Sequence, residues 1–184
     1  LIEANLTVLN VDGGEDYRLR TLKPAEIFFV PDNDENEQKL SDLFKNMSGG
    51  GAAEAGISVI HGREIPHKAK SEQVIWFDFR ALCFGPRSQA DYLYLAEHYE
   101  IVFLSGLERL TPQEKAEARR LTWLIDVLYD YRVKLCATSK VGVDDIYVEG
   151  DFAQEFTRTA SRMAEMQSEA YLKLPHLTLN APKS

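Results

Sequence analysis

The chain has 184 residues, of which 45% are hydrophobic, and its 21 basic and 29 acidic side chains give a net charge of −8. This length and composition favour a single globular domain, and the acidic balance argues against nucleic acid as a partner, because broad binding requires a basic face. No apolar run reaches the roughly 20 residues of a membrane-spanning helix, and no basic leader with an apolar core marks a signal peptide.

The first third of the chain predicts two strands, one helix and a loop. Strands are expected at Thr7–Val11 and Glu26–Val30. A helix is expected to begin at Asp34, whose side chain can cap its first turn. The apolar face of this helix consists of Leu40, Leu43, Phe44 and Met47. The glycine-rich residues 48–56 are predicted to form a flexible loop.

The middle of the chain predicts an antiparallel insert followed by a helix. Strands are expected at Ile57–Ile60 and Val74–Phe79, with the basic stretch His67–Ser71 as the solvated tip of a hairpin. Ser88 and Asp91 have the spacing of a capping box, so a helix is expected to begin there. Its buried stripe consists of Tyr92, Leu95, Ala96 and Tyr99.

Residues 99–138 carry the strongest pattern in the chain. Glu100–Leu104 and Arg132–Ala137 are apolar enough to be strands buried on both faces. Between them, the run from Thr111 to Glu114 is typical of a capped helix start, with Pro at the first helical position. A strand, a long helix and a second strand imply parallel strands joined by a right-handed crossover. We therefore expect an α/β fold with a mixed, mainly parallel sheet flanked by helices.

The last part of the chain predicts one short turn, one long helix and a tail. The turn is expected at Val143–Tyr147, and the helix is expected to span Phe152–Leu172, with Asp151 as its cap. The tail, residues 176–184, is expected to be disordered or docked on a partner. The whole chain, residues 1–184, is read as one α/β region.

No complete catalytic motif is present in the sequence. The glycine-rich stretch lacks the Lys and Ser or Thr of a phosphate-binding loop and follows a helix rather than a strand. Asp78 ends a strand as a lone carboxylate and is expected to bond to a nearby loop or cap. The four histidines lack metal-ligand spacing, so no metal site is expected. Cys83 and Cys136 are interpreted as reduced core thiols, which favours a cytoplasmic protein.

Three arginines are the candidate binding residues. Arg158 and Arg162 lie four residues apart on one helix face, a like-charge pair that is destabilising unless an anion neutralises it. That anion could be a phosphate, a neighbouring subunit or an acid on the same helix. The acids on the same helix are Glu155, Glu165 and Glu169. Arg87 directly precedes a predicted helix N-terminus, which also favours anions.

Four stretches, taken in order, resemble the C-terminal half of the ZapE-type ATPases. They are NVDGGEDYRLRTL, VIWFDFRALCFGPRSQADYLYLA, RRLTWLIDVLYDYRVKLCATS and FTRTASRMAEMQSEAYL. These proteins are bacterial cell-division ATPases and their mitochondrial relatives, a branch of the AAA-type P-loop fold, and the resemblance spans roughly Thr7 to Leu172. It implies that the phosphate-binding loop and the magnesium-binding acids lie in a preceding half. The start at Leu1, without Met, is interpreted in the same way, as that of a processed or trimmed piece.

The resemblance also implies cofactors, partners and residue roles. The parent protein would use ATP and magnesium to remodel a protein partner, whereas this chain alone would bind neither and would be inactive. The implied partners are the missing N-terminal ATPase half and the tubulin-like protein of the division ring, and an oligomer is compatible with this. Arg87, Arg158 and Arg162 would approach nucleotide or a neighbouring subunit. The junction with the missing half would be shaped by Gly13, Gly14, Asp16 and Arg18.

Two other functions remain open. The chain could be a non-enzymatic interaction module that never touches nucleotide. It could also be a small-molecule enzyme with a cleft at its strand ends, although no catalytic constellation supports that function. Finally, the central unit resembles a degenerate copy of the nucleotide half, with Ser105 and Gly106 where an acid pair would stand. The geometry of a βαβ unit can produce that likeness by itself.

Overall fold

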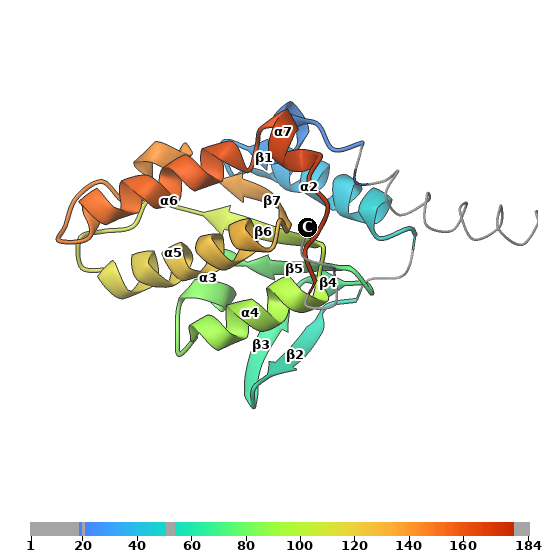
Figure 1. Cartoon of the computed structure of the whole chain (residues 1–184), viewed down its shortest axis with the longest axis horizontal. Coiled ribbons are helices and arrows are strands. Elements are labelled where there is room, and N and C mark those ends of the chain that lie inside the picture. The colour runs from blue at the N-terminus through green and yellow to red at the C-terminus, as the bar shows by residue number, and fades with distance from the viewer. Residues whose placement is uncertain (1–18, 20, 51–53, 179–184) are drawn as a thin grey trace, which may run out of the picture.

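The computed structural model describes residues 19, 21–50 and 54–178. A five-stranded sheet lies at the centre, with α2 behind it and α4, α5 and α6 in front (Figure 1). In order across the sheet, the strands are β1 (Phe28–Phe29), β7 (Lys134–Ser139), β6 (Ile101–Leu107), β5 (Val74–Asp78) and β4 (Ala69–Lys70). All neighbours pair in parallel except β4, which pairs antiparallel with β5. The predicted α/β class with a mixed, mainly parallel sheet is therefore confirmed.

Helix α2 (Asp34–Met47) covers the rear face of the sheet. Its cap is Asn33 rather than the expected Asp34, because the extended Asn33 accepts a hydrogen bond from the amide of Asn36 at 2.9 Å. The predicted apolar face packs inward, and the Phe44 ring centroid lies 5.2 Å from that of Phe103 in β6. Burial of this apolar stripe fixes α2 across the central strands.

Helices α4 (Gln89–His98) and α5 (Lys115–Asp130) cover the front face. The predicted capping box of Ser88 and Asp91 is confirmed at the start of α4. The start of α5 is later than expected. The Thr111 amide donates to the Glu114 carboxylate at 2.7 Å, but this segment is a separate turn, and the helix begins at Lys115. The expected apolar stripe of α5 is buried, which holds the helix on the sheet.

The predicted long C-terminal helix is two helices. Helix α6 (Ala153–Glu165) is followed by α7 (Glu169–Leu172). The Ser168 hydroxyl accepts a hydrogen bond from the Tyr171 amide at 3.2 Å, and this cap starts a new helix. Asp151 is not the cap of α6, since that position is Phe152. The other short elements are α3 (Phe79–Cys83) and the 3₁₀ turns η1 (Pro24–Glu26) and η2 (Val143–Asp145), the last within the predicted turn.

The antiparallel insert is a hairpin whose turn was placed wrongly by the sequence. Strands β2 (Gly56–Ile60) and β3 (Arg63–His67) pair with each other, and the chain turns at His61-Gly62. Both turn residues have positive φ, +49° and +76°, which suits the twist of a two-residue hairpin. The expected tip at His67–Ser71 is wrong, because His67 is buried and Ala69–Lys70 pairs with β5 as strand β4.

A buried lysine holds the C-terminal segment on the body. Lys134 is 1% exposed and donates to the carbonyl oxygens of Tyr171 at 3.0 Å and Leu174 at 2.6 Å. Burial lowers its pKa to about 8, and nearby Arg132 acts in the same direction. The amide of Leu177 then donates to the carbonyl of Tyr131 at 2.9 Å. The expectation of disorder from residue 176 therefore does not hold for 176–178, while 179–184 lie outside the described residues.

Two further expectations concern residues that the structure describes only in part or not at all. Of the predicted loop, residues 48–50 form a turn and Gly56 begins β2, while residues 51–53 are not described. The predicted strand at Thr7–Val11 also falls among residues that are not described. Within the described part of the chain, no helix is long and apolar enough to cross a membrane.

Candidate functional site

Two adjoining hollows form a cleft where the parallel strands end. Their volumes are about 350 and 250 Å³, and both are lined by Asp32, Asp78, Ser105 and Gly106. We call this region the strand-end cleft. Its other charged lining residues are Asp34, Glu37, Lys68, Arg80, Glu108 and Lys140. The connection after β1 leads to the rear helix and those after β5 and β6 lead to the front helices, and open α/β sheets bind ligands at such a divergence.

A polar network fills one side of the strand-end cleft. Ser105 is 4% exposed, and its hydroxyl lies 2.9 Å from both carboxylate oxygens of Glu37. It also accepts a hydrogen bond from the indole of Trp76 at 2.8 Å. The same carboxylate accepts from the Thr138 hydroxyl and pairs with the Lys68 ammonium. Glu37 thus joins α2 to β6 and β7, and its carboxylate is already engaged.

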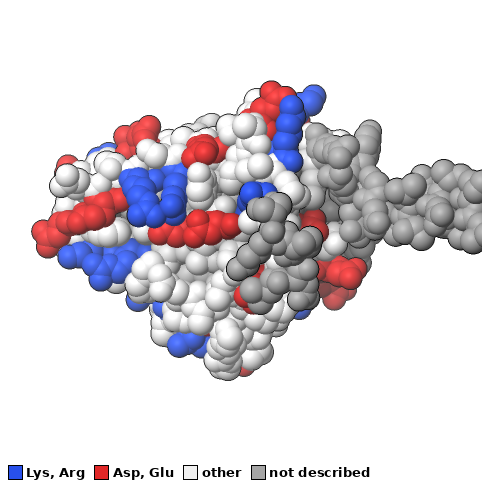
Figure 2. Space-filling view, viewed as in Figure 1, with Lys and Arg blue, Asp and Glu red and all other residues white. Residues whose placement is uncertain are grey.

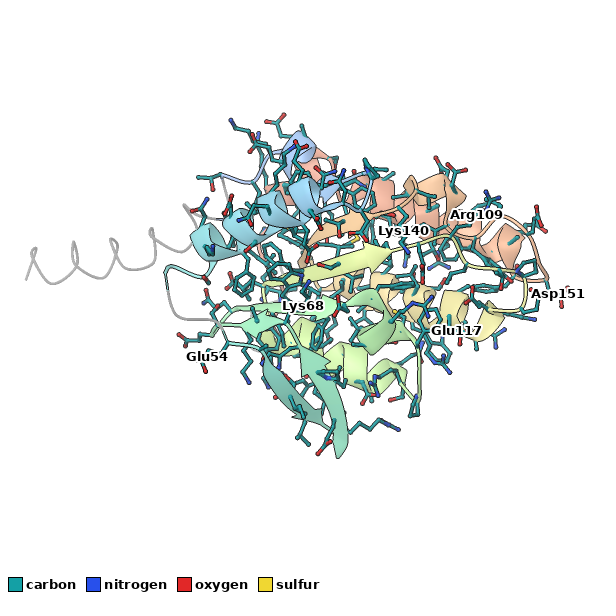
Figure 3. All side chains as sticks on the ribbon, turned by 180° about the vertical axis from the view of Figure 1, so that it is seen from behind. Glu54, Lys68, Arg109, Glu117, Lys140 and Asp151 are labelled. Carbon is teal, nitrogen blue, oxygen red and sulfur yellow. The ribbon has the colours of Figure 1, made fainter. Side chains whose placement is uncertain are left out.

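A second charged group, centred on Glu108, lies on the other side of the cleft. The Glu108 carboxylate pairs with Arg80 at 2.5 Å and with Lys140 at 3.0 Å. Burial opposes its ionisation, but Lys140 and Arg80 outweigh that effect and hold the pKa of Glu108 below its usual value. Figure 3 shows Lys140 at the end of the sheet toward which the parallel strands point. Asp78, expected to bond to a loop or cap, lies 3.8 Å from Lys68, the residue before β4.

The charges of the strand-end cleft do not suit a phosphate. Five carboxylates and three cations line it, so its formal net charge is negative. A polyanion would meet this field unfavourably. Among the described residues, no three or more His, Cys, Asp or Glu side chains are grouped to hold a metal ion.

Helices α5 and α6 lie side by side, and a series of polar contacts joins them. We call this contact, between residues 119–129 and 152–165, the α5–α6 seam. The hydroxyls of Thr122 and Thr159 lie 2.7 Å apart, and the Tyr129 hydroxyl donates to Glu165 at 2.8 Å. Between these two contacts, Arg162 pairs with Asp126. Three side-chain contacts therefore join the two helices in their middle and toward their C-terminal ends.

The predicted pair Arg158 and Arg162 is divided by this seam. Arg162 is committed: its guanidinium pairs with Asp126 and lies 4.8 Å from the ring centroid of Tyr129. The acid that neutralises Arg162 therefore comes from α5. The alternative in which an acid of its own helix neutralises it is wrong for Arg162. Arg158 is exposed, and its side chain makes no hydrogen bond or ion pair within the described part of the chain. The two arginines thus differ in availability.

Arg158 lines a hollow of about 410 Å³ at the start of the two helices. The hollow lies among Arg119, Trp123, Phe152, Glu155 and Arg158, and we call it the open end of the seam. The Arg119 guanidinium lies 5.5 Å from the ring centroid of Phe152. Figure 2 shows basic side chains gathered over α6 and near the start of α5 on this face. An unpaired guanidinium beside aromatic rings is suited to binding an anionic group.

The remaining predicted site residues lie elsewhere. Arg87 donates to the carbonyl oxygen of Ala81 at 3.0 Å and to that of Pro86 at 3.2 Å, so it ties the loop before α4 to α3. The four junction residues lie outside the described residues: Gly13, Gly14, Asp16 and Arg18.

Sequence reasoning missed the Glu37 network and the pair Arg119 and Trp123. The partners of Glu37, Ser105 and Thr138, are 68 and 101 residues away, so no local pattern marks them. Arg119 and Trp123 are four residues apart on a predicted helix, a spacing that puts both on one face. That spacing was the signal available for the open end of the seam.

The fold and its strand-end cleft define an open-sheet α/β protein. A family model described as AFG1-like ATPase matches residues 1–175, and the chain belongs to this family. It is 36% identical over 176 residues to the Escherichia coli cell division protein ZapE, covering 96% of this chain and 47% of ZapE.

More distant relatives are eukaryotic. An uncharacterized protein of Schizosaccharomyces pombe is 29% identical over 205 residues, covering 95% of this chain and 45% of that protein. Lactation elevated protein 1 homolog B of Danio rerio is 25% identical over 199 residues, covering 89% of this chain and 40% of that protein. The chain thus spans about half the length of the curated relatives that it matches. No solved structure matches it.

Proposed function

We propose that this chain is the C-terminal region of a ZapE-like ATPase that couples ATP hydrolysis to remodelling of a protein partner in cell division. The observation that carries the proposal is the family match over residues 1–175, together with similarity to ZapE over less than half of that protein. The sequence contains no G-x-x-x-x-G-K-[ST] stretch, so the triphosphate and its magnesium would be bound by residues outside it. The protein would act in the cytoplasm.

Within this proposal, Arg158 is the first candidate to meet a nucleotide or a neighbouring subunit. Its guanidinium is free within the described residues, whereas those of Arg162 and Arg87 are engaged by Asp126 and by backbone carbonyls. The partners would be the N-terminal ATPase half and the tubulin-like protein of the division ring, and the assembly could be an oligomer. The junction role of the four residues from Gly13 to Arg18 stays a prediction.

A second function, a non-enzymatic interaction module, is favoured by one observation. The strand-end cleft occupies the usual ligand position of an open sheet, yet several of its charged groups already pair with each other. A chain whose cleft cations are all engaged by its own carboxylates could act through its helical surface instead.

Reconstitution tests the first function. The sequence upstream of Leu1 should contain a phosphate-binding loop, and mixing this chain with that separately produced half should restore ATP hydrolysis. Arg158→Ala should lower the restored rate, whereas Lys39→Ala, which removes a positive charge on α2 behind the sheet, should not. Full activity of Arg158→Ala would end the arginine proposal. If no activity returns but the chain still retains the division-ring protein in a pull-down, the interaction module is the better account.

A further inference from the structure

The side-chain contacts across the α5–α6 seam follow a regular residue offset, but this offset is not continued to the N-terminal ends of the two helices. Its contacts join residues 37, 36 and 36 positions apart: Thr122 with Thr159, Asp126 with Arg162, and Tyr129 with Glu165. The same offset, continued toward the helix starts, would pair Arg119 with Glu155. That contact is not formed, because Arg119 lies over the Phe152 ring and the hollow opens there instead. The seam therefore lacks the contact that its register predicts nearest the helix starts, although Arg119 and Glu155 both line the hollow there.

We propose that the open end of the seam is a docking site for an acidic segment of a protein partner. This inference deepens the proposed function and rests on it, since it names the chemistry of the neighbour that Arg158 meets. An Asp or Glu side chain of the partner would contact the guanidinium groups of Arg119 and Arg158, which both line the hollow.

The lining of the open end has the composition of a protein-binding site. Arginine and tryptophan are enriched among residues that dominate binding energy, and here the half-buried Trp123 lines the hollow together with two exposed arginines. A guanidinium binds a carboxylate through two parallel hydrogen bonds. Gln89 and Gln154 also line the hollow and can bond to a partner's backbone. An acidic side chain next to an apolar one would use both the charge and the rings.

The charges of the lining favour a carboxylate over a polyphosphate. Arg119 and Arg158 are balanced by Glu155 and Asp126, and the latter is already paired with Arg162. A single carboxylate adds one negative charge to this group, whereas a triphosphate would add several beside Glu155. The net charge of −8 also opposes a nucleic acid, which needs many basic contacts. A short acidic peptide is therefore the occupant that the electrostatics allow.

The test uses the full 184-residue chain and a labelled peptide. The probe is a fluorescein-labelled peptide of alternating Glu and Leu, and its control carries Gln at each Glu position. Fluorescence anisotropy should show that the Glu peptide binds more tightly than the Gln peptide. Arg158→Ala should weaken that binding about tenfold, as expected for the loss of one charge-assisted contact. Arg119→Ala should act in the same direction.

Two comparison variants separate docking from general charge or fold loss. Lys39→Ala removes one positive charge from the opposite face of the sheet and should leave the affinity unchanged. Lys173→Ala removes a second exposed positive charge, which pairs with Glu169 and does not line the hollow, and should also leave the affinity unchanged. Circular dichroism of each variant checks that the chain is folded.

Several results would overturn the inference. It is wrong if neither peptide binds, if the Gln peptide binds as tightly as the Glu peptide, or if Arg158→Ala and Lys39→Ala behave alike. It is also wrong if magnesium-ATP displaces the peptide in an Arg158-dependent way, because the site would then recognise phosphate. The binding assay involves no hydrolysis. Restored ATPase activity without peptide binding would therefore contradict this inference and leave the proposed function standing, whereas the opposite result would contradict the ATPase.

Discussion

The strand-end cleft and the open end of the α5–α6 seam differ in which of their charged groups are available. The cleft lies where open α/β sheets bind ligands, yet Glu37 and Glu108 already hold its cations. The open end lies between two surface helices, where topology predicts nothing, yet its Arg158 guanidinium is unpaired within the described residues. Topology identifies a position for a site, whereas the state of the side chains decides whether that position can bind.

The largest expected effect comes from breaking the cleft network at Glu37. Glu37→Ala leaves the buried hydroxyls of Ser105 and Thr138 without their acceptor and Lys68 without its partner. We expect the free energy of unfolding to fall by about 2–3 kcal/mol, the usual cost of unsatisfied buried polar groups. Urea denaturation measures this loss.

Glu35 provides the matched control, because it lies on the same helix and pairs only with Lys39 at the exposed surface. Glu35→Ala should change the free energy of unfolding by no more than about 0.5 kcal/mol. If Glu37→Ala costs as little as Glu35→Ala, the network is not structural. The cleft would then be the better candidate for a binding site, and the comparison between the two regions would be reversed.

A smaller effect is expected from Glu108, and it depends on pH. The folded-state pKa of Glu108 is lowered from 4.5, so its stabilising contribution is present above the unfolded-state value and is lost as pH falls through the folded-state value. At pH 7, Glu108→Gln should cost about 1–2 kcal/mol, because hydrogen bonds to charged partners contribute that much. The measurement is urea denaturation of both proteins between pH 7 and pH 3.

The difference in stability between the two proteins should shrink at acid pH, since protonated Glu108 no longer attracts Arg80 and Lys140. It should also shrink at high salt, because both cations are largely exposed. A difference that stays constant from pH 7 to pH 3 would show that the carboxylate is not held by these cations.

The parts of the fold that the sequence predicted correctly depend on local patterns. The apolar runs of β6 and β7 and the buried stripe of α5 determine the parallel unit, because periodicity within one element decides burial. The hairpin turn at His61-Gly62 was missed, since the basic residues near Lys68 outweighed the turn signal of a His-Gly pair. The break between α6 and α7 was missed because the apolar pattern continues through it.

The candidate site was harder to predict because its partners are distant in sequence. The acid that engages Arg162 is Asp126, 36 residues away on α5, whereas sequence reasoning could only offer acids on the same helix. The difference between Arg158 and Arg162 arises from how α6 packs on α5, and their spacing of four residues cannot reveal it. Sequence analysis selected these two arginines together, and packing distinguishes them.

The smallest expected effect is also the most direct test of the comparison: the free energy of unfolding of Arg158→Ala beside that of Arg162→Ala, measured in urea at neutral pH. Arg162→Ala should lose about 1 kcal/mol, because it breaks a partly buried ion pair and a contact with the Tyr129 ring. Arg158→Ala should stay within about 0.5 kcal/mol of the unchanged chain. Equal losses in the two variants would contradict the account, since Arg158 would then be held by the fold rather than left free to bind.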